Sequence, residues 1–255
     1  MRILLTNDDG INSKGIFALA KELIKFAEVI IVAPEREQSA IGHAITMHQP
    51  LRSKKINFHE MNIDAWWVSG TPADCVKLAI DFLLKEAPDV VVSGMNNGEN
   101  LGKDVFYSGT VSAAIEGSFY GIKSFAVSYE DDNMKNAYTA ASVASELIKD
   151  IIAWKEYPKG VVINLNIPKI EGENSVLDWE ITELGEKSYK NKFEERKDPR
   201  GVSYYWLVGE IDFAIEPEKG TDVFAMRQGK VSITPLDIYF ENKNLIKALK
   251  KSLRQ

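Results

Sequence analysis

Two adjacent carboxylates, Asp8 and Asp9, are the residues of this sequence whose types and spacing point most directly to chemistry. They follow a short β-rich run at residues 3–6 and precede Gly10, which permits a tight turn. Because neighbouring side chains of a strand point to opposite faces, only a turn brings both carboxylates to one place. There they would repel each other, and a Mg²⁺ or Mn²⁺ ion, which prefers oxygen ligands, would relieve that repulsion. The alternative is an exposed Asp-Asp-Gly turn that caps the next helix.

Two other polar loops follow buried-type strands. The apolar run 29–32 leads into residues 33–39, which include Ser39, and the run 90–92 leads into the Gly/Asn-rich stretch 93–102. Ligands bind at the carboxyl ends of the strands in an open parallel sheet, so we expect both loops near the Asp pair.

Ser108, Gly109 and Thr110 precede a helical pattern formed by Val111 and the residues after it. Backbone N–H groups and hydroxyls at a helix N-terminus make a phosphate site. The alternative is that Ser108 or Thr110 only caps the helix. The stretch has no Gly-Lys-Ser/Thr, so it is not a Walker loop.

The other candidates favour structural roles. Ser39 and His43 lie in one loop, but a Ser nucleophile needs a paired base and the chain has no Gly-x-Ser-x-Gly elbow. A lone His is more often structural. Cys75 has no accompanying His motif and is expected to be a small core residue. Trp66 and Trp67 are expected to pack within a hairpin.

The elements that position these loops alternate between strands and helices. Apolar runs at 3–6, 29–32, 90–92, 125–127 and 161–165 are separated by segments with helical spacing. Near-continuous apolar strands indicate a parallel sheet covered on both faces. We therefore expect an α/β fold, a Rossmann-like three-layer α/β/α sandwich with a mostly parallel sheet.

Two regions depart from this pattern. Residues 51–68 alternate weakly and indicate a β-hairpin insertion into a catalytic core at residues 1–170. Residues 171–255 are expected to form a C-terminal α+β part that serves oligomerisation, with a hairpin or arm and a terminal strand and helix. Within it, residues 204–208 (YYWLV) need burial, in an interface or as an extra strand of the same subunit, and residues 187–200 could be a solvated loop.

Composition excludes several classes. The 31 Lys and Arg against 37 Asp and Glu give a net charge of −6, which argues against nucleic-acid polymers and anionic membranes as partners. One cysteine excludes a disulfide framework and a multi-cysteine zinc site. No stretch approaches the length of a membrane span or a signal peptide, so we expect a cytoplasmic protein.

Taken together, six segments closely resemble the SurE family, the stationary-phase survival proteins. They are RILLTNDDG, APEREQSAIGHAIT, VSGTPADCV, VVSGMNNGENLG, VFYSGTVSAAIEG and TDVFAMRQGKVSITPL, and they occur in this order over most of the chain. Ala40 and Ser112 depart from the usual family residues, but both are small.

The resemblance implies a metal-dependent 5′/3′-nucleotidase with a protruding hairpin and a C-terminal part that builds homodimers or homotetramers. It implies one divalent metal ion per subunit, Mg²⁺ or Mn²⁺, held by Asp8, Asp9, Ser39 and Asn96. Phosphate would bind at Asn96, Ser108, Gly109 and Thr110, and Asp8 and Asp9 would be catalytic, with Asp8 favoured for proton transfer.

The reaction expected on this basis is hydrolysis of a nucleoside monophosphate, and of short polyphosphate as a further substrate, by direct attack of a metal-activated water. Two other classes of protein also use acidic residues that follow the first strand of such a sheet. A signalling receiver domain also has acidic residues after its first strand, but it is about half this length and Asp64 precedes a strand rather than following one. A haloacid-dehalogenase-type phosphatase needs Asp-x-Asp, and here the acids are adjacent.

Overall fold

The computed structural model describes residues 1–255 apart from 59–60, 132–133, 171–176, 188, 212–215 and 254–255. Its centre is a nine-stranded sheet in the order β3-β4-β2-β1-β5-β6-β7-β11-β8. The strands of this sheet are β1 (Arg2–Thr6), β2 (Glu28–Pro34), β3 (Ser53–Asn57), β4 (Asp64–Val68), β5 (Val90–Asn97), β6 (Lys123–Tyr129), β7 (Val161–Ile167), β8 (Trp179–Ile181) and β11 (Val231–Asp237).

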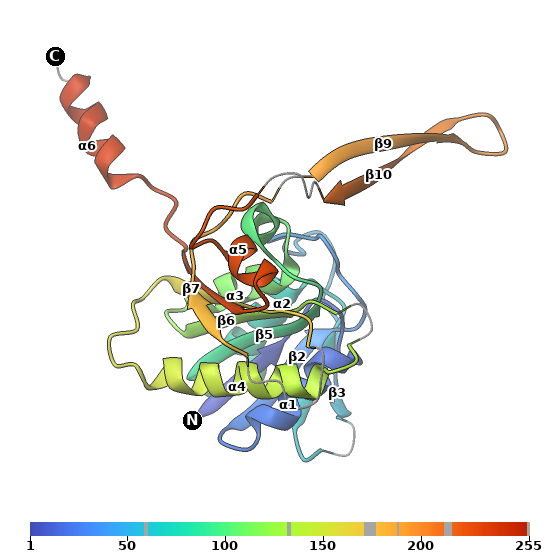
Figure 1. Cartoon of the computed structure of the whole chain (residues 1–255). Coiled ribbons are helices and arrows are strands. Elements are labelled where there is room, and N and C mark those ends of the chain that lie inside the picture. The colour runs from blue at the N-terminus through green and yellow to red at the C-terminus, as the bar shows by residue number, and fades with distance from the viewer. Residues whose placement is uncertain (59–60, 132–133, 171–176, 188, 212–215, 254–255) are drawn as a thin grey trace.

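Helices cover both faces of the sheet, which confirms the predicted three-layer α/β/α sandwich (Figure 1). The helices are α1 (Lys14–Leu23), α2 (Pro72–Leu78) with a π-helical turn η1 (Ala79–Leu83), a 3₁₀ helix η2 (Gly102–Phe106), α3 (Gly109–Phe119), α4 (Ala137–Ala153), α5 (Asp222–Arg227) and α6 (Lys243–Ser252). Helices α1 and α4 lie on one face, and α2 and α3 on the other (Figure 1).

The central strands are buried on both faces because their sequences are apolar throughout. In β1, Ile3 and Leu5 belong to the core that includes residues of α1 and α4. Leu4, between them, packs in the second core with Cys75 of α2. This alternation keeps the carboxyl end of β1 in a fixed place between two helical layers.

The order of the strands reverses at β1, which pairs in parallel with β2 on one side and with β5 on the other. Such a reversal opens a crevice at the carboxyl ends of the two strands. Strand β5 is longer than the predicted run 90–92, because it continues with an irregularity between Ser93 and Asn96. The polar loop after β1 and the end of β5 therefore meet at this crevice.

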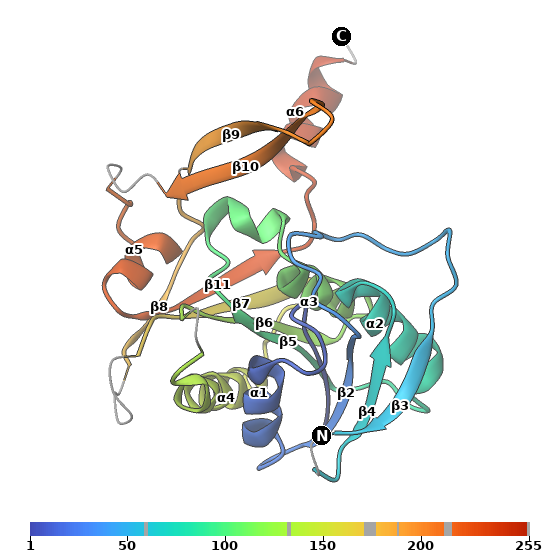
Figure 2. The same cartoon turned by 90° about the vertical axis from the view of Figure 1, so that its right-hand side faces the viewer.

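The hairpin predicted at residues 51–68 is formed by β3 and β4, but it does not protrude. Strand β4 pairs in parallel with β2, so the hairpin extends the edge of the central sheet. The element that protrudes is a separate antiparallel ribbon, β9 (Tyr189–Lys197) with β10 (Ser203–Ile211) (Figures 1 and 2). The interpretation of residues 187–200 as a solvated loop is therefore wrong for most of this segment.

The C-terminal residues contribute to the same sheet as the core. Strand β11 pairs antiparallel with β7 and carries β8 on its outer side (Figure 2). The expected boundary at residue 170 thus does not separate two sheets. Helix α6 and the ribbon extend away from the body (Figure 1). Among the described residues, no helix is long and apolar enough to cross a membrane.

Candidate active site

The turn after β1 is held by the side chain of Asn7. Its Nδ2 donates to the Gly10 carbonyl at 2.9 Å and to Ser13 Oγ at 2.8 Å. Ser13 is the N-cap of α1 and accepts from the amide of Ile16. The Asp pair is therefore not the cap of the next helix, and the alternative of an exposed capping turn is wrong, since Asp8 is only 6% exposed.

Gly10 lets this turn pack against the loop that follows β2. Its φ is +92°, and a Cβ there would lie 3.2 Å from the backbone carbon of Arg36. The amide of Gln38 donates to the Asp8 carbonyl at 2.7 Å. The loop that carries Ser39 is thereby fixed against the loop that carries the two carboxylates.

The first turn of α3 orients Asp8. Thr110 Oγ1 donates to Asp8 Oδ1 at 2.5 Å, and the Thr110 amide donates to Asp8 Oδ2 at 3.1 Å. Gly109 makes this approach possible, because a Cβ there would lie 2.8 Å from the Asp8 Cβ. Asp9 is held less tightly, with Oδ2 accepting from the Asn97 amide at 3.2 Å.

Both carboxylates are placed where their charged forms are unfavourable. Burial raises the pKa of Asp8, against the opposing effect of the Thr110 hydrogen bonds. Burial and the neighbouring Asp8 charge raise the pKa of Asp9 to about 6. A bound cation would offset both effects.

The predicted metal ligands line one cavity of about 320 Å³. Its walls are formed by Asp8, Asp9, Glu37, Ser39, Ala40, Asn96, Asn97, Glu99, Asn100, Asp104, Tyr107 and Ser108. Within it, Ser39 Oγ donates to Glu37 Oε1 at 2.5 Å, and Asn96 Nδ2 donates to the Gly98 carbonyl at 2.8 Å. The amide oxygen of Asn96 is thus the end of that side chain available as a ligand.

This donor set fits a hard divalent cation. The lining side chains offer carboxylate, hydroxyl and amide oxygens and no imidazole or thiol. Among the described residues there is no group of three or more His, Cys, Asp or Glu side chains arranged to hold a metal. A metal at this cavity would therefore be held by two carboxylates together with neutral oxygen donors.

The residues predicted to bind phosphate divide into two pairs. Asn96 and Ser108 line the cavity, and Ser108 is also the N-cap of α3, with Oγ accepting from the Val111 amide at 3.1 Å. Both interpretations of Ser108 are therefore compatible with its position. Gly109 and Thr110 lie behind Asp8, and Thr110 is fully buried.

Residues outside the cavity lining have structural partners. His43 Nε2 lies 2.9 Å from Glu116 Oε2, and its ring stacks on Phe119. Cys75 is fully buried, as predicted, and burial raises the pKa of its thiol well above its usual range. Trp66 lies in the β3–β4 hairpin beneath the ammonium group of Lys55.

Sequence reasoning did not select Glu37, Glu99, Asn100 or Asp104, all of which line the cavity. Glu37 lies in the loop 33–39, and Glu99 and Asn100 lie in the stretch 93–102, both of which were expected at strand ends. Their position was therefore the only signal in the sequence. The fourth, Asp104, lies in η2, for which no pattern was identified.

The family model of the survival protein SurE matches residues 3–191. A protein of Moorella thermoacetica with the name 5′-nucleotidase SurE is 48% identical over 242 residues, which cover 95% of this chain and 92% of that protein. A protein of the same name from Heliobacterium modesticaldum is 45% identical over 246 residues, 96% of this chain and 89% of that protein.

The crystal structure of the SurE protein from Aquifex aeolicus has the same fold, with a TM-score of 0.85, 36% identity and full coverage of both chains. Sequence and fold thus agree over nearly the whole length, including all the strands that frame the cavity. The chain belongs to the survival protein SurE family.

Proposed function

We propose that the protein is a phosphomonoesterase that hydrolyses nucleoside 5′-monophosphates, and also 3′-monophosphates, to nucleoside and phosphate. One observation carries this proposal: Asp8, Asp9, Ser39, Asn96 and Ser108 meet in one cavity where the strand order reverses. The names of the relatives from Moorella and Heliobacterium support the same reaction class.

Asp8, Asp9, Ser39 and Asn96 would hold one divalent cation per subunit, Mg²⁺ or Mn²⁺. When bound, such a cation would polarise phosphoryl oxygens and lower the pKa of water. Ser39 and Asn96 are neutral, so the two carboxylates supply the negative charge of the ligand set. The Thr110 hydrogen bonds keep Asp8 in one orientation, which favours a fixed ligand geometry.

Phosphate would lie between these residues and the N-terminus of α3. The Ser108 hydroxyl accepts from the Val111 amide and so retains its own hydrogen for a phosphate oxygen. The Asn96 side chain and the positive end of the helix dipole would add to this site. Gly109 and Thr110 would act on phosphate indirectly, because they position Asp8 at the same place.

Proton transfer is assigned differently from the expectation that favoured Asp8. Both oxygens of Asp8 already accept hydrogen bonds from Thr110, and the Asp8 side chain is buried, so it has little freedom to reach a proton on water. Asp9 is more accessible and has one oxygen on the Asn97 amide. We therefore favour Asp9 for exchanging a proton with the attacking water or with the leaving oxygen.

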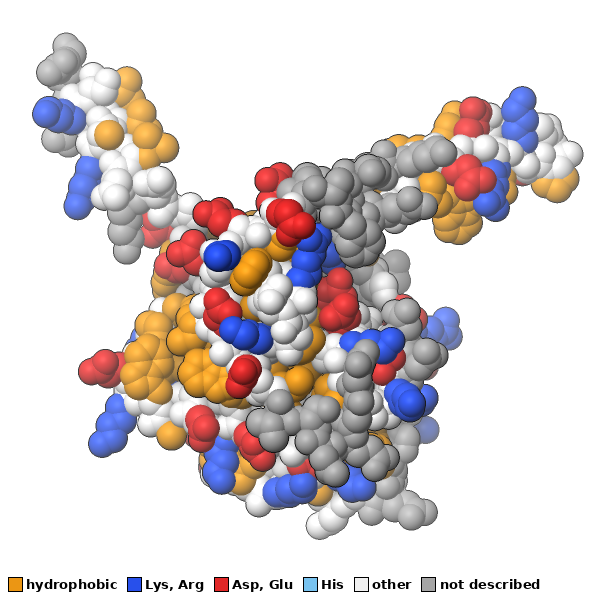
Figure 3. Space-filling model, in the orientation of Figure 1, with side chains coloured by type: hydrophobic (Ala, Val, Ile, Leu, Met, Phe, Trp, Pro, Cys, Tyr) orange, Lys and Arg blue, Asp and Glu red, His pale blue; other side chains and the backbone are white. Residues whose placement is uncertain are grey.

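A second copy of the chain would cover apolar surfaces of the C-terminal part. Hydrophobic side chains gather on the ribbon and on α6 (Figure 3). The exposed ones are Phe193 and residues 204–208 of the ribbon, with Trp206 57% exposed, and Leu245, Ile246 and Leu249 of α6 with its C-cap Leu253. The alternative that residues 204–208 form a buried strand of their own subunit is therefore wrong. An isolated ten-residue helix and a two-stranded ribbon need partners to be stable.

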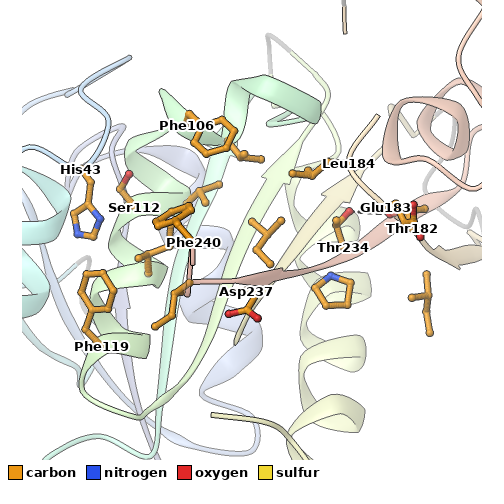
Figure 4. A pocket seen from close by; sticks show the side chains of 17 residues that line it. His43, Phe106, Ser112, Phe119, Thr182, Glu183, Leu184, Thr234, Asp237 and Phe240 are labelled. Atoms are coloured by element: carbon orange, nitrogen blue, oxygen red, sulfur yellow. Dashed lines mark hydrogen bonds between the residues drawn. The ribbon is translucent and has the colours of Figure 1, made fainter. Parts of the chain in front are cut away.

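A cavity of about 900 Å³ on the body could receive such an element. It lies between α3 and β11, with Phe106, Phe119 and Phe240 among its labelled side chains (Figure 4). Phe240 and Phe106 are 76% and 61% exposed, so the cavity opens on an apolar surface. Homodimers or homotetramers formed through these surfaces would bury the exposed apolar side chains.

A substrate panel tests the proposed reaction. Nucleoside 5′- and 3′-monophosphates, sugar phosphates and short polyphosphate are incubated with Mg²⁺, Mn²⁺, Co²⁺ or Ca²⁺, and the released phosphate is measured. Turnover of nucleoside monophosphates that disappears with EDTA is expected, and its absence with every metal would overturn the proposal. Trapping of an aspartyl-phosphate would instead favour the receiver or dehalogenase type of chemistry.

A further inference from the structure

A buried lysine from the C-terminal part lies against the wall of the proposed active site. Lys187 is 8% exposed, and its Nζ lies 3.0 Å from Glu99 Oε1 and 2.8 Å from Asp104 Oδ2. Both carboxylates line the cavity that contains Asp8 and Asp9. Lys187 thus contacts two residues of the cavity wall, although it lies 88 residues after Glu99 and 83 residues after Asp104 in the sequence.

The backbone around Lys187 is fixed to the same wall by Asp222, the first residue of α5. Asp222 is fully buried, and its two oxygens accept from the amides of Gly102 and Gly185 at 2.8 and 2.7 Å. Gly102 and Gly185 are in direct backbone contact, because a Cβ on Gly102 would lie 2.3 Å from the Gly185 carbonyl oxygen. The position of Lys187 is therefore set by packing rather than by the ion pairs alone.

The lining of the cavity is rich in carboxylates. Five carboxylates line the cavity, namely Asp8, Asp9, Glu37, Glu99 and Asp104. One divalent cation offsets two of these charges, and a phosphate monoester brings up to two more negative charges. Lys187 pairs with Glu99 and Asp104, which belong to the wall but not to the proposed metal ligands.

We propose that Lys187 is a positioning residue that holds Glu99 and Asp104 in the wall and cancels part of their charge, so that the cavity accepts a phosphate anion. The proposal rests on the phosphatase activity proposed above. It differs from a purely structural ion pair, because it requires the affinity for phosphate, and not only the stability of the fold, to depend on the charge of Lys187.

Substitution of the lysine tests this directly. Lys187→Met keeps most of the side-chain volume and removes the charge, and Lys187→Arg retains it. The matched control is Lys103→Met, because Lys103 and Glu186 form an exposed pair at 3.8 Å between the same two segments. KM and kcat for a nucleoside monophosphate, the inhibition constant of inorganic phosphate and the melting temperature are measured at saturating Mn²⁺ and at low and high ionic strength.

The proposal expects Lys187→Met to raise KM and the phosphate inhibition constant roughly tenfold at low salt, with a smaller effect on kcat. Added salt should reduce this defect, because it screens the repulsion between carboxylates and phosphate. Lys187→Arg should recover most of the affinity, and Lys103→Met should match the wild type. A lowered melting temperature with unchanged KM and inhibition constant would overturn the proposal.

A triple variant keeps the test decisive if Lys187→Met alone fails to fold. Lys187→Met combined with Glu99→Gln and Asp104→Asn removes the lysine together with the two carboxylates that it pairs with, so the rise in KM should be much smaller than tenfold. A tenfold rise in KM in the triple variant would contradict the charge argument. If the wild type itself shows no turnover, the proposed function fails instead, and calorimetric binding of inorganic phosphate to the Mn²⁺-loaded variants still decides the role of Lys187.

Discussion

Thr110 Oγ1 donates a 2.5 Å hydrogen bond to Asp8 Oδ1, and this contact joins the first turn of α3 to the end of β1. The two residues are 102 positions apart in the sequence. The predicted phosphate-binding segment and the predicted metal ligands are therefore parts of one hydrogen-bonded unit. A change in either residue should affect both metal and phosphate.

Removal of the Thr110 hydroxyl is expected to weaken metal binding. Thr110→Val keeps the shape of the side chain and the amide hydrogen bond but frees Asp8 Oδ1, so Mn²⁺ affinity should fall about 10- to 100-fold. Titration calorimetry with Mn²⁺ measures this. Thr110→Ser retains the donor and should bind nearly as the wild type does.

A matched control for this experiment is Thr182→Val, since Thr182 is a buried hydroxyl that contacts Ser232 and Thr234 away from the proposed metal ligands. It should lose stability and keep its metal affinity. If Thr110→Val raised KM for the nucleotide while Mn²⁺ affinity stayed unchanged, Thr110 would be a phosphate ligand rather than a support of Asp8.

The pH dependence of stability should change when Asp9 is neutralised. The folded-state pKa of Asp9 is about 6 against an ordinary value of 3.8, so between these pH values the folded state binds a proton more tightly than the unfolded state. The free energy of unfolding of the metal-free protein therefore falls as pH rises through this window. Asp9→Asn removes that loss, and its advantage over the wild type should grow by about 2 kcal/mol from pH 4 to pH 7.

Urea unfolding in EDTA at several pH values measures this difference. Asp150→Asn, at an exposed position on α4, serves as the control and should keep a constant offset from the wild type. An equally constant offset for Asp9→Asn would show that Asp9 is not stabilised in its neutral form by the fold.

Asp222→Asn should destabilise the contact between the C-terminal part and η2. The amide group replaces one acceptor oxygen with a donor, which would then face the amide of Gly102 or Gly185. A loss of about 2–3 kcal/mol in the free energy of unfolding is expected for a buried charged acceptor. Chemical denaturation measures it, and a loss below about 0.5 kcal/mol, the usual range for a surface change, would contradict the structural role.

The ribbon formed by β9 and β10 is expected to lie in an interface between subunits. Trp206→Glu places a charge in the surface that we expect to be covered in the oligomer, so the variant should be smaller than the wild type in light scattering. Tyr138→Glu is the control, because Tyr138 is an exposed aromatic residue on α4, away from the ribbon. A monomeric wild type at micromolar concentration, or a full-size oligomer of the Trp206→Glu variant, would rule out this interface.

Much of the site could be predicted from two sources, the polar residues after apolar strands and the resemblance to a known family. Asp8 and Asp9 were predicted from residue type and position at a strand end, and Ser39 and Asn96 from the resemblance to the SurE family. The sheet order brings all four to one crevice. Local patterns determine this much, since parallel strands place their carboxyl ends at one edge.

The supporting residues could not be predicted in the same way. The partner of Thr110, and the contacts of Lys187 and Asp222, join segments between 37 and 120 residues apart and have no local pattern. Lys187 lies at the start of a polar run that resembles a solvated loop, yet it is buried because the backbone packs on Gly102. Such contacts depend on tertiary packing, which a single sequence does not reveal.

The central claim is that Asp8 and Asp9 together hold the catalytic metal. The most direct measurement is Mn²⁺ binding and phosphate release from a nucleoside 5′-monophosphate by Asp8→Asn and Asp9→Asn, with Asp64→Asn as control and circular dichroism to verify the fold. Each active-site variant should lose Mn²⁺ affinity and most of its turnover, because each removes one charge from a site for a hard cation. Near-wild-type turnover at low metal concentration in either variant would contradict the account.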